Sequence, residues 1–149
     1  MRNLALLWSA IAVLAMGACG EQAPEQALPT PADTVDMALA EYDPAAFDTI
    51  TWETPEEALV RGSVVFSVSC RKCHGPQGYG DGGFVAAGDT LRPPSFHGPD
   101  WRFREDHAGL TRQIFIGTTE GMPHWGLTAL SLRDIDAVAQ FIQLQFAAN

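Results

Sequence analysis

The chain has 149 residues, which is enough for one modest domain together with a leader or a tail. It carries 18 acidic and 9 basic side chains, and its net charge is −9. Most of the acidic side chains lie before residue 58, and from Ala58 onward the two signs balance with no basic stripe. This distribution excludes a nucleic-acid-binding protein, because such a protein needs clustered Lys and Arg to neutralise phosphates.

The first residues have the pattern of an export signal. Arg2 supplies a positive charge, an apolar run extends from Leu4 to Met16, and small residues follow. The run is shorter than the roughly 20 apolar residues that a membrane-spanning helix needs. We therefore expect residues 1–18 to be a signal peptide rather than a membrane span, and a buried core helix is the alternative.

The end of this leader indicates how the protein is anchored. "LAMGAC", which ends at Cys19, resembles the cleavage box of bacterial lipoproteins. We expect a lipoprotein-type signal peptide over residues 1–18, lipidation of Cys19, and a location on the periplasmic side of a bacterial membrane. An ordinary signal peptide that leaves Cys19 as a free thiol is the alternative.

Residues 19–53 are rich in Pro, Ala and acidic side chains and lack amphipathic periodicity. This composition is typical of a disordered or weakly structured segment. A short helix could form around residues 35–40, but the sequence shows nothing for it to pack against. The predicted organisation is thus a lipid-anchored, flexible acidic tether over residues 19–53 and a folded domain over residues 54–149.

The folded domain is predicted to begin with a helix. Thr54 can cap it, Pro55 suits its first position, and Glu57 completes a capping box. Steps of three and four residues place one set of residues on a single face: Leu59, Gly62, Phe66, Cys70 and Cys73. A glycine in mid-helix costs about 1 kcal/mol relative to Ala, which is acceptable where another helix crosses closely.

The helix ends in "SCRKCHG", where Cys70 and Cys73 are one turn apart and His74 follows directly. A structural zinc site needs four Cys or His ligands, and no second pair with zinc spacing exists in the sequence. A redox dithiol usually opens a helix after a strand, whereas this pair closes a helix. Covalent haem uses all three residues, as two thioethers and one iron ligand. We therefore predict one covalently bound haem c, with zinc and a dithiol as weaker alternatives.

Around this motif the sequence resembles the class I cytochromes c, from about Thr54 to Phe146. The matching stretches are "GSVVFSVSCRKCHG", "GMPHW" and a final amphipathic helix. The resemblance implies an all-α class I cytochrome c fold, a small helical domain around one haem. "YGDGG" with "RPPSFHGPDWR" is further similar to monohaem lipoprotein subunits of quinol-oxidising membrane complexes, notably alternative complex III, and to free monohaem carriers.

The resemblance also implies a second axial iron ligand, for which Met or His is the usual choice. Met16 lies in the leader and Met37 in the tether, so Met122 in "TTEGMPHWG" is the expected ligand. His124 could replace Met122 if the loop shifted. A methionine that merely fills a gap in the core is the other interpretation.

Two groups of residues are expected around the haem. The iron-bound imidazole needs a partner for its other nitrogen, and the proline-bearing loop of the family implies the carbonyl of Pro93 or Pro94. Haem propionates need donors, for which Trp101, Arg102 and Arg104 form the candidate cluster. The alternatives are prolines that only stiffen a loop and a surface patch of aromatic and arginine side chains.

Two further helices complete the predicted domain. A middle helix is expected in "HAGLTRQIFIGTTEG", ending near Gly117 with these residues inward: Leu110, Ile114 and Phe115. A last helix should begin at Ser131, with Asp134 in its first turn and this buried stripe: Ile135, Val138, Ala139, Ile142 and Phe146. Because class I folds cross the first and last helices, Gly62 and Phe66 should meet the region of Ala139 and Ile142.

The function that the resemblance implies is electron transfer in a bacterial respiratory chain, without chemistry on a substrate. The expected partners are redox proteins or neighbouring subunits, and the membrane through Cys19. One alternative is a fixed haem subunit of a membrane quinol-oxidising complex. Another is a gas sensor or peroxidase with an open iron site, against which Met122 argues.

Overall fold

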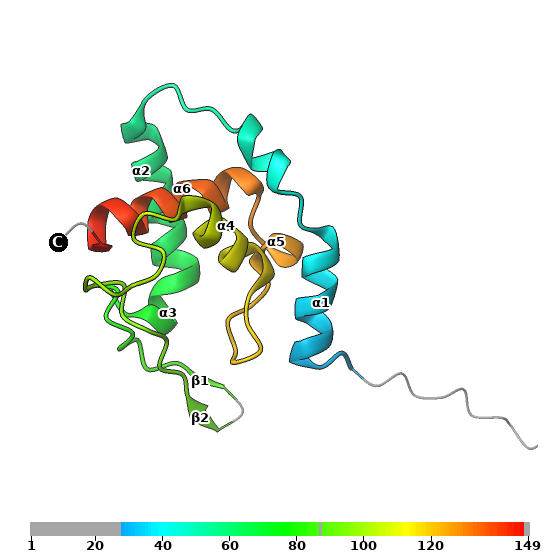
Figure 1. Ribbon diagram of the computed structural model, residues 1–149. Coiled ribbons are helices and arrows are strands. Elements are labelled where there is room, and N and C mark those ends of the chain that lie inside the picture. The colour runs from blue at the N-terminus through cyan, green and yellow to red at the C-terminus, as the bar shows by residue number, and fades with distance from the viewer. Residues whose placement is uncertain (1–27, 87, 148–149) are drawn as a thin grey trace, which may run out of the picture.

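Helices form most of the structure of residues 28–86 and 88–147, the part of the chain that the computed structural model describes (Figure 1). The α-helices are α1 (Pro31–Glu41), α2 (Pro55–Val65), α3 (Arg71–His74), α4 (His107–Ile116), α5 (Trp125–Thr128) and α6 (Leu132–Ile142). The other segments are the 3-10 helix η1 (Pro44–Thr49), the π-type turns η2 (Phe66–Cys70) and η3 (Gln143–Ala147), and an antiparallel hairpin of β1 (Val85–Ala86) and β2 (Asp89–Thr90). The mainly helical class is as expected.

The predicted leader over residues 1–18 and the predicted lipid site Cys19 lie outside the described residues. Within the described ranges, no helix has both the length and the apolar character needed to cross a membrane.

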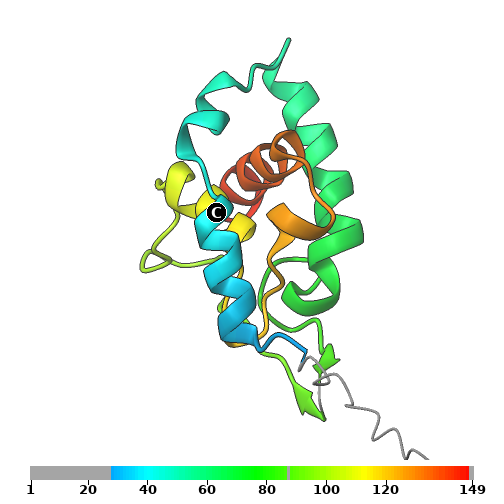
Figure 2. The same ribbon diagram turned by 90° about the vertical axis from the view of Figure 1, so that its right-hand side faces the viewer.

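Helix α6 crosses α2 at Gly62 (Figures 1 and 2). A Cβ at Gly62 would overlap the carbonyl oxygen of Ala137 and lie 2.6 Å from the Cβ of Phe141. Only glycine therefore lets the two helices approach this closely. The expected crossing is present, but its centre lies at Ala137 and Phe141 rather than at Ala139 and Ile142.

Side chains close in sequence cap the N-termini of α2 and α6. The side chain of Thr54 accepts the N–H of Glu57 at 3.2 Å, but the Glu57 carboxylate accepts from the N–H of Glu53 rather than completing the expected box. Ser131 and Asp134 form a complete capping box at the start of α6. The sequence therefore placed both helix starts correctly.

The buried faces of α4 and α6 are those that the periodicity predicts. Helix α4 ends at Gly117, whose φ is 78°. The predicted inward residues are buried in both helices: Leu110, Ile114 and Phe115 in α4, and Ile135, Val138, Ala139 and Ile142 in α6, with Phe146 following in η3. Together these side chains form much of the hydrophobic core.

The N-terminal part of the described chain packs against the domain. Ala38 of α1 is fully buried, and the ring of Tyr42 meets the ring of Phe115 edge-on, with centroids 5.4 Å apart. This corrects the prediction of a flexible tether for residues 31–52. The sequence of that segment does not reveal its partners, because they lie far along the chain in α4 and α6.

A hydrogen-bonded group around Asp136 fastens the end of this N-terminal segment. Asp136 is only 7 % exposed. Its Oδ2 accepts from Nε1 of Trp52 at 2.7 Å and from Nε2 of Gln140 at 2.8 Å, while its Oδ1 lies 2.8 Å from Nε2 of His107. One carboxylate thus joins the N-terminal segment, α4 and α6.

The other side of His107 also faces an acceptor. Its Nδ1 lies 3.0 Å from Oε1 of Gln143, whose amide nitrogen donates to the carbonyl of Phe103 at 2.8 Å. With an acceptor at each ring nitrogen, both nitrogens donate when the imidazole is protonated. The surroundings therefore favour a positively charged His107 beside Asp136.

Stability should consequently fall at alkaline pH through His107. The hydrogen bond with Asp136 raises the pKa of His107 above its usual value, although burial opposes this. The stabilisation is fully present below the unfolded-state pKa of about 6.5 and is lost as the pH rises through the higher folded-state pKa. The loss should be modest, because the side chain is 40 % exposed and water screens the pair. The loss of stability is measured by the urea midpoint of the haem-loaded protein at a series of pH values from below about 6.5 upward.

The loss of stability at low pH has a different origin. Burial raises the pKa of Asp136, but hydrogen bonds from His107, Trp52 and Gln140 outweigh it and leave the pKa below its usual value. That contribution is present above about pH 3.8 and is lost as the pH falls further. His107→Gln should flatten the alkaline fall and also weaken the acid fall, because His107 lowers the pKa of Asp136. An unchanged alkaline fall in this variant would contradict the assignment.

Candidate cofactor site

The cysteines and the histidine lie at the end of the helical run that begins with α2. Helix α2 passes through η2 into α3, and in η2 the N–H of Arg71 donates to the carbonyl of Phe66, five residues earlier. This π-type turn is wider than an α-helical turn, and such turns are frequent at functional sites. Cys70 is buried and Cys73 is half-buried, while His74 closes α3.

Both thiols are unpaired and neutral. Burial raises the pKa of Cys70 to about 12 and also raises the pKa of Cys73, despite the nearby charge of Lys72. Among the described residues, no group of three or more His, Cys, Asp or Glu side chains could hold a metal ion. The donors present therefore fit two thioether bonds better than the zinc alternative.

His74 has the properties of an iron ligand. Burial lowers its pKa to about 4, so the imidazole is neutral at ordinary pH and has a lone pair to donate. Its Nδ1 is buried and has no hydrogen-bond partner among the described residues. Such an unpaired buried atom costs roughly 1–3 kcal/mol. Among the described residues, Nδ1 therefore lacks the carbonyl partner that was expected from Pro93 or Pro94.

The proline loop reaches His74, but not through the expected hydrogen bond. The carbonyl of Pro93 lies against Gly80, whose N–H donates to the backbone carbonyl of His74 at 2.8 Å. Neither Pro93 nor Pro94 accepts from Nδ1 of the imidazole. Instead the imidazole stacks on Phe96, with ring centroids 4.6 Å apart and planes inclined by 19°. No signal in the sequence singled out Phe96.

Phe96 belongs to an aromatic cluster that supports one side of the site. It is 6 % exposed, and its ring centroid lies 5.3 Å from Trp101, 6.1 Å from Phe146 and 6.4 Å from Phe66. Trp101 is therefore placed next to the ring that touches His74. Its position in the surroundings of the cofactor stays a prediction.

The arginines of the same predicted cluster interact with the protein itself. Arg102 donates to the side chain of Gln113 at 2.9 Å and lies over the ring of Phe103. Arg104 donates to the carbonyl of Gly98 at 3.2 Å. A propionate contact by Arg102 therefore stays a prediction, and it would require exchange of the bond to Gln113.

Met122 lies in a short closed loop between α4 and α5. The N–H of Thr118 donates to the Met122 carbonyl at 3.0 Å, and the Met122 N–H donates to the hydroxyl of Thr118 at 3.3 Å. A Cβ at Gly117 would lie 2.5 Å from the same carbonyl. The half-buried Met122 packs against the hydrophobic core. In Figures 1 and 2 this loop and α3 lie toward the end of the molecule that carries the β hairpin.

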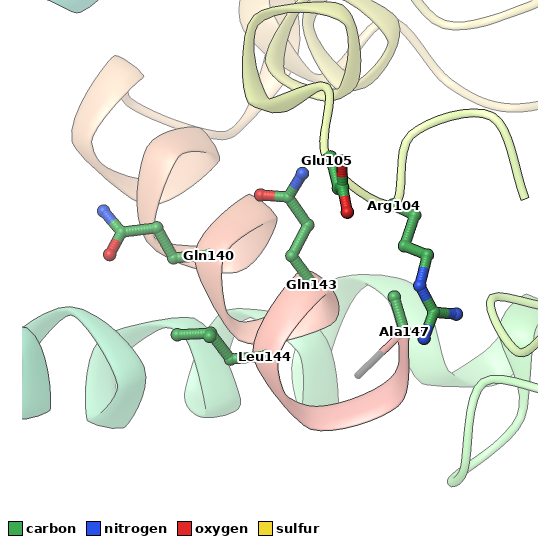
Figure 3. A pocket seen from close by; sticks show the side chains of 6 residues that line it. All are labelled: Arg104, Glu105, Gln140, Gln143, Leu144 and Ala147. Atoms are coloured by element: carbon green, nitrogen blue, oxygen red, sulfur yellow. The ribbon is translucent and has the colours of Figure 1, made fainter. Parts of the chain in front are cut away.

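Two surface pockets lie away from these residues. One, of about 440 Å³, separates the end of α6 from the chain before α4 (Figure 3) and is lined by Arg104, Glu105, Gln140, Gln143, Leu144 and Ala147. The other, of about 510 Å³, lies beside the start of α2 and is lined by Thr54, Glu56, Glu57, Val60, Arg61 and Val64. Neither is lined by Cys70, Cys73, His74 or Met122, although Arg104 of the predicted propionate cluster lines the first.

A protein-family model described as "Cytochrome C oxidase, cbb3-type, subunit III" matches residues 57–142, more than half of the chain. The matched range contains the two cysteines, His74 and Met122, whereas α1 and η1 precede it. No curated protein and no solved structure matches the chain.

Proposed function

Because the chain belongs to this family of c-type cytochromes, we propose that it is an electron carrier with one covalently bound haem c. Cys70 and Cys73 form the thioether bonds, and His74 and Met122 ligate the iron. The observation that carries this proposal is a neutral, buried imidazole that directly follows the unpaired thiol of Cys73 and lies one turn after that of Cys70.

Each residue has a definite task in this proposal. The bound haem supplies an iron that takes up and releases one electron. The sulfur atoms of Cys70 and Cys73 fix the position of the group, and His74 donates its lone pair. Met122 provides a thioether, which raises the reduction potential relative to a second histidine. The ring of Phe96 stacks on the imidazole of His74, and Trp101 packs against Phe96.

For the cellular setting we propose a lipid anchor at Cys19, after removal of residues 1–18, on the periplasmic side of a membrane. The second candidate is a fixed haem subunit of a membrane oxidoreductase. It is favoured by the matched family, whose description names an oxidase subunit. Mild detergent extraction separates the two, since a fixed subunit co-purifies with its neighbours and a free carrier does not.

Absorption spectra of the haem-loaded protein test the ligation. The oxidised protein should show the weak band at the red edge of the visible spectrum that comes from methionine sulfur on ferric iron. Carbon monoxide should leave the spectrum of the reduced protein unchanged, because Met122 occupies the sixth position. A missing band together with ready binding of carbon monoxide would instead indicate an open iron site, and thus sensing or catalysis.

A further inference from the structure

We propose that Tyr42, in the N-terminal segment outside the family match, is a positioning residue for the Met122 loop. This inference rests on the proposed ligation of iron by Met122. On this proposal the N-terminal segment does more than connect the domain to an anchor, because it also supports the redox site. Three successive contacts carry the argument.

The first contact joins the N-terminal segment to α4. The ring of Tyr42 meets the ring of Phe115 at an interplanar angle of 63°, an edge-to-face geometry that aromatic pairs favour. Phe115 is only 6 % exposed. The ring of Tyr42 also contacts the ring of Phe47 in η1, with centroids 5.9 Å apart. Tyr42 thus links Phe115 of α4 to η1.

The second contact joins α4 to α5. A Cβ at Gly126 would overlap the ring of Phe115, so the backbone of Gly126 lies directly against that ring. The position of Phe115 therefore sets how closely α5 approaches α4. If the ring of Tyr42 is removed, Phe115 can move outward, and α5 loses the surface against which it is held.

The third contact joins both helices to the methionine. Only residues 117–124 connect α4 to α5, and Gly117 and Thr118 touch the backbone of Met122. A loop this short, with both ends on rigid helices, follows any shift of those helices. Tyr42 therefore acts on Met122 through Phe115 and α5, without touching it.

The test compares variants of the full haem-loaded chain. Tyr42→Ala should reduce the ferric methionine band by at least about half, because a small loss of support shifts the population toward the unligated loop. The reduced variant should also bind carbon monoxide, and the amide protons of Thr118 and Met122 should exchange faster. Tyr42→Phe keeps the ring and should match the parent in all three measurements.

Trp52→Ala is the matched control. It removes an aromatic ring from the same segment, but Trp52 bonds to Asp136 of α6 and not to Phe115. This variant should lose stability and keep the methionine band. If Tyr42→Ala yields no folded haem protein, the same measurements are made on Tyr42→Leu, which replaces the ring by a smaller apolar side chain.

Each outcome decides between the two proposals. A parent that lacks the band and binds carbon monoxide overturns Met122 ligation and, with it, the role of Tyr42. A parent with the band, together with Tyr42 variants that retain it fully, overturns only the role of Tyr42. Equal loss of the band in Trp52→Ala also overturns that role, since general destabilisation then explains the effect.

Discussion

Replacement of Met122 by Ala should leave the haem attached and open the iron to small ligands. The thioether bonds of Cys70 and Cys73 do not depend on Met122, so the covalent haem stain on a denaturing gel should be unchanged. If the iron–sulfur bond contributes about 3 kcal/mol, its loss raises the apparent affinity of the reduced protein for carbon monoxide about 100-fold. The red-edge band of the oxidised protein should disappear.

His124→Ala is the matched control for that experiment, because His124 is in the same loop and is the competing ligand. It should retain the band and should not bind carbon monoxide. The reverse result, with loss of the band in His124→Ala and no change in Met122→Ala, would assign the iron to the histidine. A parent and a Met122→Ala variant that bind carbon monoxide equally would reject Met122 ligation.

Gly62→Val should be the most damaging single substitution in the helical framework. The new side chain would enter the crossing of α2 and α6, where the Ala137 carbonyl and the Cβ of Phe141 leave no room. Both are backbone or near-backbone atoms, so a rotamer change cannot relieve the overlap. Overpacking of this kind costs about 1–3 kcal/mol, and more when helices must separate. The free energy of unfolding by denaturant, measured on the haem-loaded protein, should fall by at least about 3 kcal/mol.

The control for this substitution is Val60→Ala, on the solvent side of the same helix. Val60 is 66 % exposed, so its truncation should change the unfolding free energy by less than about 0.5 kcal/mol. Gly62→Ala should fall between the two, because one methyl group already overlaps the carbonyl of Ala137. A Gly62→Val variant as stable as the parent would show that the two helices separate without cost.

The sequence predicts the parts of the fold that depend on near neighbours. Thr54 and Ser131 start their helices by bonding to groups three residues away. The inward faces of α4 and α6 follow from helical periodicity alone. The close crossing at Gly62 could be anticipated because a mid-helix glycine is costly unless a second backbone comes near. The predicted partners on α6 were one or two residues away from the observed ones, since periodicity does not fix how far one helix slides along another.

The N-terminal segment could not be predicted in the same way. Trp52 and Asp136 are 84 positions apart, and neither has a local pattern that reveals the other. Composition alone indicated a flexible chain, because a segment rich in Pro and acidic residues has little apolar surface of its own. A few well-placed rings, such as Tyr42 on Phe115, suffice to dock it.

The candidate site likewise contains residues that a local motif predicts and residues that only the fold brings together. Cys70, Cys73 and His74 form a local motif whose spacing already predicts the chemistry. Phe96 lies in a loop without periodicity, and only the fold brings its ring onto the imidazole of His74, with Trp101 behind it. Arg102 donates to Gln113 in the structure, so its predicted contact with a propionate stays a prediction.

The docked N-terminal segment also limits how far the protein can travel. If Cys19 carries the lipid, as we propose, the leash between the lipid and the start of α1 at Pro31 consists of residues 19–30. Even fully extended, a leash of that length spans no more than about 40 Å, against about 120 Å for a free chain up to residue 53. The domain would then reach only positions close to the surface of the bilayer. Its donor and acceptor would have to lie in that layer, and a partner in the bulk of the periplasm would have to come to the membrane.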